Sequence, residues 1–422
     1  MNHASPGPSA LDRRSLVLAA LSTVVEWYDF TLYLYLATVL SRVFFLGGDA
    51  VLTALLGFAM AYLMRPVGAM VFGHFGDRRG RRATLLASMA LMTVAMLLTA
   101  LLPTAGQAGP VAGVLLLALR CVMGFAVGGE YTGVVAYLLE GAPRRRRGFV
   151  TSLAAATSEI GGLLAAAVSA LTVSLLPAPA LESWGWRIPF LFGGALAGSI
   201  LLARAAMAES PEFEAHRAAG TLAKRPLSNA LVHHRTGILR GFAISALGSI
   251  TYYVGITYVP VYLTSMGSLS EAQALQLATI AALAVIVVTP FVGLLSDRFG
   301  RRPVLVALAV LSAALPWTLF RLLGGASPMA ALAGAVVLAM LAGGVSAVGA
   351  VATAEQVPAQ GRLSGLALGA TTATALFGGL TPWLAQVLTT RTASASAPGA
   401  MIAVVALCVL PVLLKLPETR PE

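Results

Sequence analysis

Long apolar runs alternating with short polar segments dominate the chain. Twelve of these runs come close to the 20 or so residues that a helix needs to cross the hydrocarbon core of a bilayer. They cover residues 15–40, 51–73, 83–102, 110–139, 149–176, 187–207, 237–265, 272–296, 303–323, 329–355, 364–389 and 399–416. Because a backbone in lipid must satisfy its own hydrogen bonds, the runs are predicted to be helices. The pattern therefore predicts an all-α membrane protein with twelve transmembrane helices.

One long polar break, at residues 208–236, separates six of these runs from the other six. We therefore expect two pseudo-symmetric six-helix halves that face each other across a central cavity. The expected parts are an N-terminal tail at 1–14, a first half at 15–207, a linker at 208–236, a second half at 237–416 and a tail at 417–422.

Two repeated motifs support a duplication. Residues 73–82 read GHFGDRRGRR, and residues 293–302 read GLLSDRFGRR, so that Asp77 and Asp297 stand 220 positions apart. A second echo, at an offset of 215 positions, matches Glu, Pro and Arg after the fourth run with the same residues after the tenth: Glu140, Pro143 and Arg147 with Glu355, Pro358 and Arg362. Each copy lies at the same place in its half, as expected for a two-fold carrier.

The repeated loop suggests a latch. Asp77 and Asp297 are predicted to accept hydrogen bonds from the N-terminus of a neighbouring helix, whose dipole favours an anion, while the arginines pair with acids or phospholipid. Such a latch closes one side of a carrier in one state and opens in the other. The alternative is a basic loop that only sets topology. The predicted gating residues are Asp77, Arg78, Arg82, Asp297, Arg298 and Arg302.

Composition and charge agree with a membrane protein. The chain is 58% hydrophobic and 11% charged, against about a quarter charged in soluble domains. The net charge of +11 comes from basic residues that gather on one side of the predicted membrane. This positive-inside pattern places both termini in the cytoplasm and leaves no reason to expect nucleic-acid binding. Cys121 and Cys408 fall within predicted spans, so no disulfide framework is implied.

Two acids lie in the first predicted helix. Glu26 and Asp29 are three residues apart and share a face. An ionised carboxylate at the bilayer centre costs roughly 2.5–3.5 kcal/mol, so the pair is expected to face a cavity. We interpret both as candidates for proton coupling or substrate contact, and the alternative is a structural ion pair with a neighbouring helix.

A deep arginine accompanies these acids. Arg120 lies about ten residues into the fourth run, whereas Arg65 stands closer to the cytoplasmic end of the second. A guanidinium does not deprotonate, so a deep one must pair with an acid or a bound anion. Arg120 is predicted to bind a substrate carboxylate. The alternative is a structural bridge to Glu26, Asp29 or Glu159.

Further polar residues in the spans give weaker signals. Glu130 is interpreted either as a proton acceptor or as a partner of Arg78 or Arg82, and Glu159 as a deep acid exposed to the cavity. Four tyrosines in the first and seventh helices are candidates for contacting a polar substrate, with simple packing as the alternative: Tyr28, Tyr33, Tyr252 and Tyr253. Intramembrane charge is concentrated in the first half, so the coupling chemistry is expected there. No metal or other cofactor is expected, because the five histidines fall in tail or loop positions.

The loop motif resembles the signature of the major facilitator superfamily. Further blocks are similar to its metabolite:proton symporter family: EWYDF at 26–30, RPVGAMVFGHFGDRRGRR at 65–82, GGEYTG at 128–133, WGWRIPF at 184–190, ESPEF at 209–213 and FGGLTP at 377–382. The block SGLALGATTATALFGG at 364–379 most resembles citrate and related carboxylate carriers such as those for α-ketoglutarate. One departure is Met123, where the superfamily has Gln three residues after the arginine.

The leading functional hypothesis is a symporter of a small organic anion, such as a di- or tricarboxylate, driven by the proton gradient. Arg120 would bind the carboxylate, and Glu26, Asp29, Glu130 or Glu159 would carry the proton. Open alternatives are an exporter of a polar metabolite or polycarboxylate siderophore, and a proton symporter of a zwitterionic osmolyte such as proline or betaine. An enzyme is disfavoured, since no nucleophile–base cluster is visible in the spans. The resemblance implies a monomer in a bacterial inner membrane.

Overall fold

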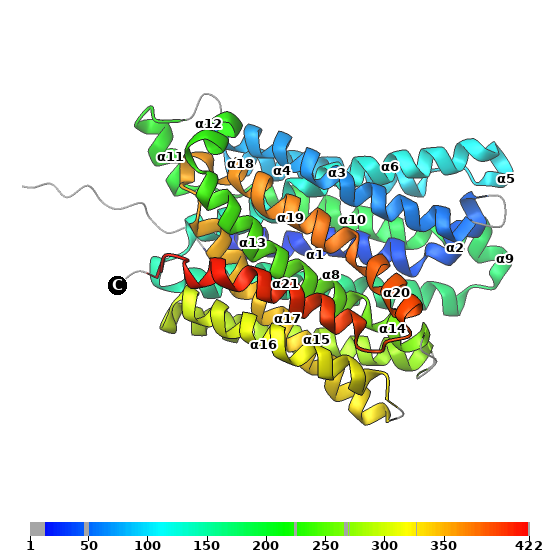
Figure 1. The fold of residues 1–422 in the computed structure, drawn as a ribbon. Coiled ribbons are helices and arrows are strands. Elements are labelled where there is room, and N and C mark those ends of the chain that lie inside the picture. The colour runs from blue at the N-terminus through cyan, green and yellow to red at the C-terminus, as the bar shows by residue number, and fades with distance from the viewer. Residues whose placement is uncertain are drawn as a thin grey trace, which may run out of the picture.

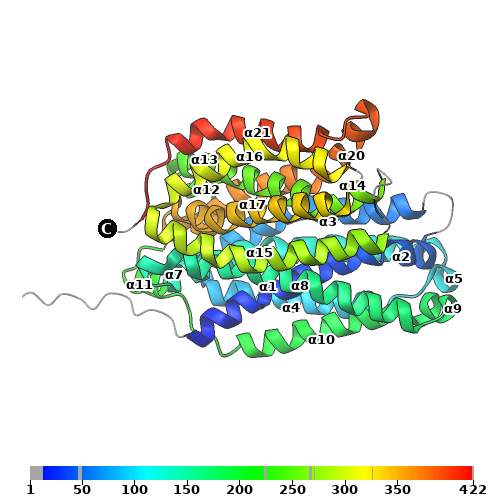
Figure 2. The same cartoon turned by 90° about the horizontal axis from the view of Figure 1, so that it is seen from below.

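The computed structural model describes residues 13–45, 50–222, 226–265, 269, 271–325 and 327–420. Most of the expected N-terminal tail, residues 1–12, lies outside them. The described chain is almost entirely helical, and its long helices run side by side (Figure 1). A view turned by 90° shows the same parallel arrangement (Figure 2).

The first six predicted spans are all helical. They correspond to α1 (Arg13–Tyr35) with α2 (Ala37–Phe44), α3 (Ala50–Arg79), α4 (Arg81–Ala100), α6 (Pro110–Gly128) with α7 (Glu130–Gly141), α8 (Arg147–Leu175) and α10 (Arg187–Arg204). Two short helices, α5 (Ala105–Ala108) and α9 (Ala178–Ala180), join them at one end of the bundle. The linker carries α11 (Pro211–Ala218) and α12 (Pro226–His233) at the other end.

The second half repeats the pattern. Its spans are α13 (Arg235–Tyr252) continued by η3 (Tyr253–Thr257) and α14 (Val259–Ser265), α15 (Glu271–Phe299), α16 (Arg301–Leu323), α17 (Pro328–Glu355), the segment 362–392 and α21 (Ala397–Leu414). Among the described residues, ten helices are long and apolar enough to cross a membrane. The other two expected spans correspond to α3 and to α13–η3–α14. The predicted all-α fold with twelve spans is confirmed.

Glycines set the close packing around the centre of the first half. A Cβ on Gly124 of α6 would come within 2.0 Å of the Ala61 carbonyl oxygen of α3, and one on Gly128 within 2.2 Å of the Arg65 carbonyl oxygen. A Cβ on Gly161 of α8 would come within 2.3 Å of the Val24 carbonyl oxygen of α1. Small residues permit such backbone approach between membrane helices. The packing fixes how the turns that carry Arg65 and Glu26 are rotated.

The repeated loops lie at one end of the bundle, here called the latch end. Gly80 and Gly300 have φ angles of 112° and 102°, which a residue without a Cβ adopts readily. Each makes the tight turn between two long helices, α3 to α4 and α15 to α16. The linker helices and the end of α21 lie at this same end, on the left in Figure 1.

Two faces join the halves. Helix α8 packs along α15 and α17, and α3 packs along the segment 362–392. That segment is α18 (Arg362–Leu366), the π-helix η5 (Ala367–Thr371), α19 (Thr372–Thr374), the π-helix η6 (Ala375–Gly379) and α20 (Thr381–Thr392). The π-helical turns η3, η5 and η6 lie in two spans of the second half, and another, η2 (Leu181–Gly185), precedes α10 of the first half. Such turns are often found at functional sites.

Candidate functional site

The latch consists of two matching sets of hydrogen bonds. The Asp77 carboxylate accepts from the backbone N–H groups of Leu363 (3.3 Å) and Ser364 (2.9 Å), in the first turn of α18. The Asp297 carboxylate accepts from Gly148 (2.8 Å) and Phe149 (2.9 Å), in the first turn of α8. Each aspartate therefore binds a helix N-terminus of the opposite half. The predicted type of contact is present in both copies.

One arginine in each repeat supports its aspartate. The Arg81 guanidinium donates to Asp77 (3.0 Å) and to Glu140 (2.9 Å), and the Arg301 guanidinium donates to Asp297 at 2.7 Å. Arg301 also pairs with Glu355 at 3.3 Å. These two arginines are almost fully buried. Sequence reasoning missed them, although they occupy equivalent positions in both repeats, four residues after the aspartate.

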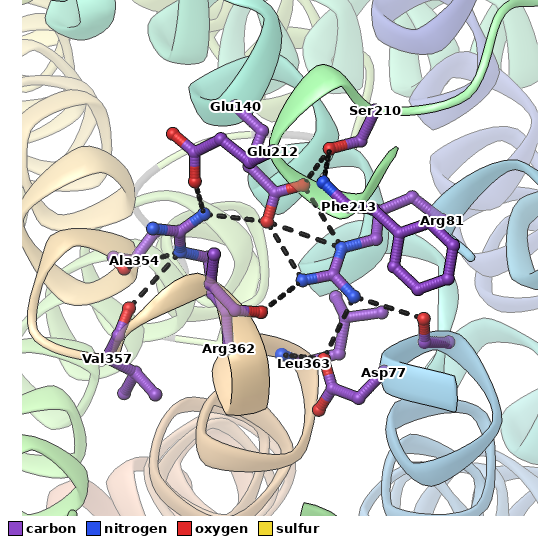
Figure 3. Close-up of polar contacts among 12 residues, drawn as sticks. Asp77, Arg81, Glu140, Ser210, Glu212, Phe213, Ala354, Val357, Arg362 and Leu363 are labelled. Carbon is purple, nitrogen blue, oxygen red and sulfur yellow. Dashed lines mark hydrogen bonds and ion pairs between the residues drawn. The ribbon is translucent and has the colours of Figure 1, made fainter. Parts of the chain in front are cut away.

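A further ion-pair network ties the linker into the latch. Figure 3 shows Glu140 between Arg81 and Arg362, with Glu212 of the linker on the other side of Arg362. Arg362 pairs with Glu140 at 2.6 Å and with Glu212 at 2.9 Å. Glu212 also pairs with Arg147 at 2.7 Å. The second sequence echo therefore supplies charges that join the two halves.

The other loop arginines lie at the edges of this network. The Arg82 guanidinium donates to the Ala205 carbonyl at 2.5 Å, and Arg298 lies over the Phe299 ring at 5.5 Å. Arg302 uses its backbone N–H to bind Glu418. Arg78 lines a groove on the outer face of α3 beside Phe75. The gating roles of these residues stay predictions.

A third repeat caps two helices at the latch end. Glu209 accepts hydrogen bonds from the N–H groups of Arg81 and Arg82, and Glu418 accepts from those of Arg301 and Arg302. Burial raises the pKa of Glu209 despite these bonds. At Glu418, burial acts in the same direction, but four backbone N–H bonds outweigh it and hold the pKa below its ordinary value.

A cavity of about 150 Å³ lies between the halves. Its charged lining residues, among those described, are Glu26, Arg65 and Glu159. Trp27, Tyr131, Tyr252 and Tyr253 supply aromatic surface. The second half contributes small and hydroxyl-bearing residues, including Ser245, Ser249, Ser346, Thr353, Thr371 and Thr374. The walls from the two halves are therefore chemically different.

Arg65 and Glu26 form the ionic centre of the cavity. Their closest charged atoms are 3.4 Å apart. The guanidinium lies over the rings of Phe30 (3.9 Å) and Tyr62 (4.5 Å). Both carboxylate oxygens of Glu26, and the Nε and Nη2 groups of Arg65, are buried without a hydrogen-bond partner among the described residues. Buried polar groups normally have partners, so this pair has free hydrogen-bonding capacity directed to a ligand or water.

Aromatic residues and Glu159 form a second centre. The Tyr252 hydroxyl donates to the Glu159 carboxylate. The Trp27 ring packs against Tyr252 and Tyr253, with centroids 5.1 and 6.4 Å away. The Tyr253 hydroxyl in turn hydrogen-bonds that of Tyr62, which links η3 to α3 across the halves. Glu159, Tyr252 and Tyr253 thus line the cavity, in accordance with the cavity exposure expected of Glu159.

Arg120 and Asp29 form a separate buried ion pair. Their closest charged atoms are 2.9 Å apart, and both residues are almost fully buried. The guanidinium also reaches the Thr99 hydroxyl at 3.4 Å and lies 5.1 Å from the centre of the Tyr33 ring. Neither charged residue lines the cavity. Of the open alternatives, the bridge to Asp29 is present, and a substrate role for Arg120 stays a prediction.

Two of the four candidate tyrosines have structural partners instead of facing the cavity. The Tyr28 hydroxyl donates to the Pro189 carbonyl at 2.8 Å, and the Tyr33 hydroxyl donates to the Ala54 carbonyl at 2.7 Å. Neither residue lines the cavity. Their substrate role also stays a prediction.

Glu130 pairs with Arg204, at 2.5 Å, and both side chains are fully buried. The expectation of Arg78 or Arg82 as its partner was wrong. Glu130 begins α7, and its carboxylate contacts Ser88 of α4 and Arg204 of α10. Ser88 donates to the same carboxylate at 2.6 Å, and Ser22 contacts Arg204. Its role in proton coupling remains untested.

Comparison with known proteins identifies the family to which this helical architecture belongs. Residues 15–237 match the model of the family described as sugar (and other) transporters. Residues 267–422 match that of the major facilitator superfamily. The chain belongs to the major facilitator superfamily. It is a membrane transporter and not an enzyme.

Relatives with different substrates are similarly close. The ectoine/proline transporter ProP of Corynebacterium glutamicum is 34% identical over 87% of this chain and 76% of its own. The citrate-proton symporter of Klebsiella pneumoniae is 32% identical over 91% of this chain and 87% of its own. The structure of the proton:xylose symporter XylE bound to 6-bromo-6-deoxy-D-glucose superposes with a TM-score of 0.83, at 19% identity and 96% coverage of both chains. That likeness shows the fold of this major facilitator transporter.

Arg65 and Trp27 are among the cavity residues that sequence reasoning did not select. The sequence indicates that Arg65 stands closer to the cytoplasmic end of its span, yet Arg65 lines the cavity of the transporter. Trp27 lies in the sequence between the candidate acids Glu26 and Asp29, and its buried indole N–H has no hydrogen-bond partner in the described part of the chain. A helical wheel of α1 does not single out Trp27, since residues 26 and 27 are about 100° apart. No local signal distinguishes Arg65 from Arg120.

Proposed function

We propose that this transporter is a proton-coupled symporter of a small zwitterion that carries one carboxylate and one cationic nitrogen, as amino acids and betaines do. The observation that carries the proposal is the charge of the cavity. Its described lining holds one guanidinium, Arg65, and two carboxylates, Glu26 and Glu159. A di- or tricarboxylate would meet a single cation and two acids there, whereas a zwitterion has a partner for each of its charges.

Arg65 is the proposed site for the substrate carboxylate. Its Nε and Nη2 groups lack hydrogen-bond partners among the described residues, and a guanidinium binds carboxylates in a two-pronged geometry. The rings of Phe30 and Tyr62 hold the guanidinium in place. The Trp27 indole N–H is a further donor on the same wall.

Glu159 and the neighbouring aromatic rings are the proposed site for the cationic nitrogen. Trp27 and Tyr252 pack edge to face at 5.1 Å beside the Glu159 carboxylate. Aromatic faces attract ammonium groups, quaternary ones included. A carboxylate beside such faces adds a direct charge partner that is poorly screened in a cavity.

Competition for Arg65 explains how proton and substrate are coupled. When Glu26 is ionised it holds Arg65, at 3.4 Å between charged atoms. Protonation of Glu26 removes that competitor and frees the guanidinium for the substrate carboxylate. Proton and substrate binding then favour each other by the same factor, as linkage requires. Asp29, which pairs with Arg120, is proposed as a second proton site. It is coupled to the first proton site, Glu26, because both acids lie on helix α1.

The latch end is proposed to face the cytoplasm. Basic residues gather there, with Arg144, Arg145 and Arg146 exposed and close to the loop arginines. With that orientation, we expect both termini in the cytoplasm and the transporter in a bacterial inner membrane. With the latch formed, the cytoplasmic side is closed. Alternating access then requires the Asp77 and Asp297 contacts to break while the halves rock about the cavity. A monomer suffices, since both halves are in one chain.

A second candidate is the symport of a small organic anion with one carboxylate. The N–H groups of Arg65 that lack a hydrogen-bond partner among the described residues favour it as strongly as they favour a zwitterion. The citrate-proton symporter among the relatives keeps this candidate open for larger anions. The Glu159 and aromatic centre argues against it, because a plain anion has no group for that wall.

Uptake by liposomes that contain the purified protein tests the proposal. A pH gradient is imposed, and accumulation of proline, betaine, shikimate, α-ketoglutarate and citrate is measured. Proline or betaine should accumulate, and collapse of the proton gradient should abolish accumulation. Accumulation of citrate or α-ketoglutarate in preference to both zwitterions would contradict the substrate class. Zwitterion accumulation that survives collapse of the gradient would contradict proton coupling.

A further inference from the structure

The cavity wall formed by the second six-helix half holds a polar group, the Thr371 hydroxyl, that the proposed function does not use. Thr371 lines the cavity and is only 7% exposed, and its hydroxyl has no hydrogen-bond partner among the described residues. A buried hydroxyl without a hydrogen-bond partner destabilises the folded protein by an amount on the order of 1–3 kcal/mol. Native proteins retain such groups where a ligand or an ordered water completes them.

The backbone around Thr371 is also unusual. Thr371 is the last residue of the π-helix η5, and η6 begins four residues later at Ala375. A π-helical turn breaks the regular i to i−4 hydrogen bonding of a helix and is frequent at functional sites. Between the two turns, the Thr374 hydroxyl accepts a hydrogen bond from Ser249 of α13 at 3.1 Å. Both of these residues line the cavity.

Thr371 lies at a depth that one small solute can share with Arg65. Arg65 precedes Asp77 of the latch by twelve residues, about 18 Å along a helix axis. Thr371 follows Arg362 of the latch by nine residues, about 13 Å along the axis. The two side chains belong to opposite halves and line the same cavity. Thr353, the other unpartnered threonine of the cavity, is two residues from Glu355 and hence only about 3 Å from the latch.

We propose that Thr371, with the Ser249–Thr374 pair beside it, forms a hydroxyl subsite that binds an uncharged hydrogen-bonding group of the substrate. The preferred substrate is then a zwitterion with a third polar group, such as a ring hydroxyl. The subsite rests on the proposed function, because it assumes that the substrate charges occupy the Arg65 and Glu159 side of the cavity. It assigns the second half a share in selectivity, although the described residues of that half bring no charge to the cavity.

Matched pairs of competitors test this subsite in liposomes. Uptake of labelled proline and of labelled ectoine is measured, and each is competed by the unlabelled solute and by its hydroxylated analogue, 4-hydroxyproline or hydroxyectoine. The wild-type protein should bind the hydroxylated member about three- to tenfold more tightly in at least one pair, the range expected for one net hydrogen bond. Thr371→Val should abolish that preference and leave the affinity for the parent solute within about twofold. Thr371→Ser should retain it.

Thr353→Val is the matched control, since its hydroxyl is also unpartnered but lies next to the latch. It should keep the preference. The subsite is overturned if the wild type prefers neither hydroxylated member, if Thr371→Val keeps the preference, or if Thr353→Val loses it equally. Normal uptake of proline or ectoine in these cases leaves the proposed function standing. Absence of uptake of both solutes, with accumulation of citrate or α-ketoglutarate, overturns the proposed function and this subsite with it.

Discussion

The two halves of the transporter contribute equivalent residues to the latch but different residues to the cavity. At the latch, each half supplies the same parts: Asp77 and Asp297 on a helix N-terminus of the other half, each with an arginine four residues on. In the cavity, the first half supplies the charged residues Glu26, Arg65 and Glu159, and the described second half supplies Tyr252 and Tyr253 together with aliphatic, hydroxyl-bearing and small side chains. The contacts that are proposed to open and close together are alike in the two halves, whereas the cavity walls that are proposed to bind one asymmetric solute differ.

The largest expected effect concerns the two intramembrane arginines of the first half. Arg65→Ala should weaken substrate binding by at least about 30-fold, because a buried charge partner worth 2 kcal/mol or more is lost. Arg120→Ala leaves Asp29 buried and unpaired and should reduce the folded yield, since such a loss costs about 3–5 kcal/mol. The protein that does fold should bind substrate within about threefold of wild type, measured by equilibrium binding in detergent. Normal binding by Arg65→Ala with loss of binding by folded Arg120→Ala would reverse the two assignments.

The second expected effect separates the two acids of the cavity. Glu26→Gln mimics the protonated form that frees Arg65. It should support exchange of substrate across the membrane and lose accumulation driven by a pH gradient. Glu159→Gln should keep gradient-driven accumulation and raise KM for a zwitterion by about tenfold, through loss of a charge partner. Full gradient-driven accumulation by Glu26→Gln would exclude the competition mechanism.

The latch gives the next comparison, between two copies of one contact. Asp77→Asn and Asp297→Asn should each favour opening at the latch end by about tenfold or more, because each removes charge-assisted bonds to a helix N-terminus. Accessibility is read from a cysteine introduced as Thr353→Cys, with Cys121 and Cys408 replaced by alanine. A membrane-impermeant thiol reagent applied at the latch end should modify it faster in both variants. Unchanged rates in both would leave the loop with only a topological role.

The supporting arginines should show a smaller and unequal effect. Arg81 donates three hydrogen bonds to Glu140, at 2.9, 3.1 and 3.3 Å, and another to the Ala359 carbonyl. Arg301 meets Glu355 at the longer distances of 3.3 and 3.4 Å. Arg81→Gln should therefore lower the Tm in detergent more than Arg301→Gln. A larger loss for Arg301→Gln would show that Glu140 is held mainly by Arg362.

The smallest effect distinguishes the two helix-capping glutamates. The pKa of Glu418 is lowered in the folded protein, so its stabilising effect is present above the unfolded pKa and is lost as the pH falls through the folded value. Glu418→Gln should slightly lower the Tm at neutral pH and match wild type in acid. The pKa of Glu209 is raised by burial, so Glu209→Gln should have no such cost at neutral pH. Equal Tm losses for the two variants at neutral pH would contradict this difference.

Several features of this site follow from the sequence because they are local or repeated. The latch aspartates could be assigned from the copies at 73–82 and 293–302, since a repeated charged loop between spans constrains where each aspartate lies. The arginine that supports each aspartate could have been found in the same way. The Glu209 and Glu418 caps could not, because the residues around them, ESPE and PETR, share too little sequence.

The cavity residues depended on contacts between helices. Arg65 and Arg120 are both arginines within apolar spans, and depth along the chain favoured Arg120. The packing of the helices gives a different result. At Gly124 and Gly128, α6 lies directly against the α3 backbone at Ala61 and Arg65. Arg65 then lines the cavity, and Arg120 lies against Asp29, Tyr33 and Phe190. Likewise, Glu130 pairs with Arg204, which is 74 positions away in the chain.

The sequence by itself determined the number and extent of the spans, the two-fold repeat and the latch aspartates. These features depend on hydrophobic length and on motifs that a stretch of chain carries with it. Only the tertiary structure decided which charges meet in the cavity and which are paired behind it. That choice depends on the rotation of each helix about its axis, and the rotation is fixed by close backbone contacts between helices far apart in the chain.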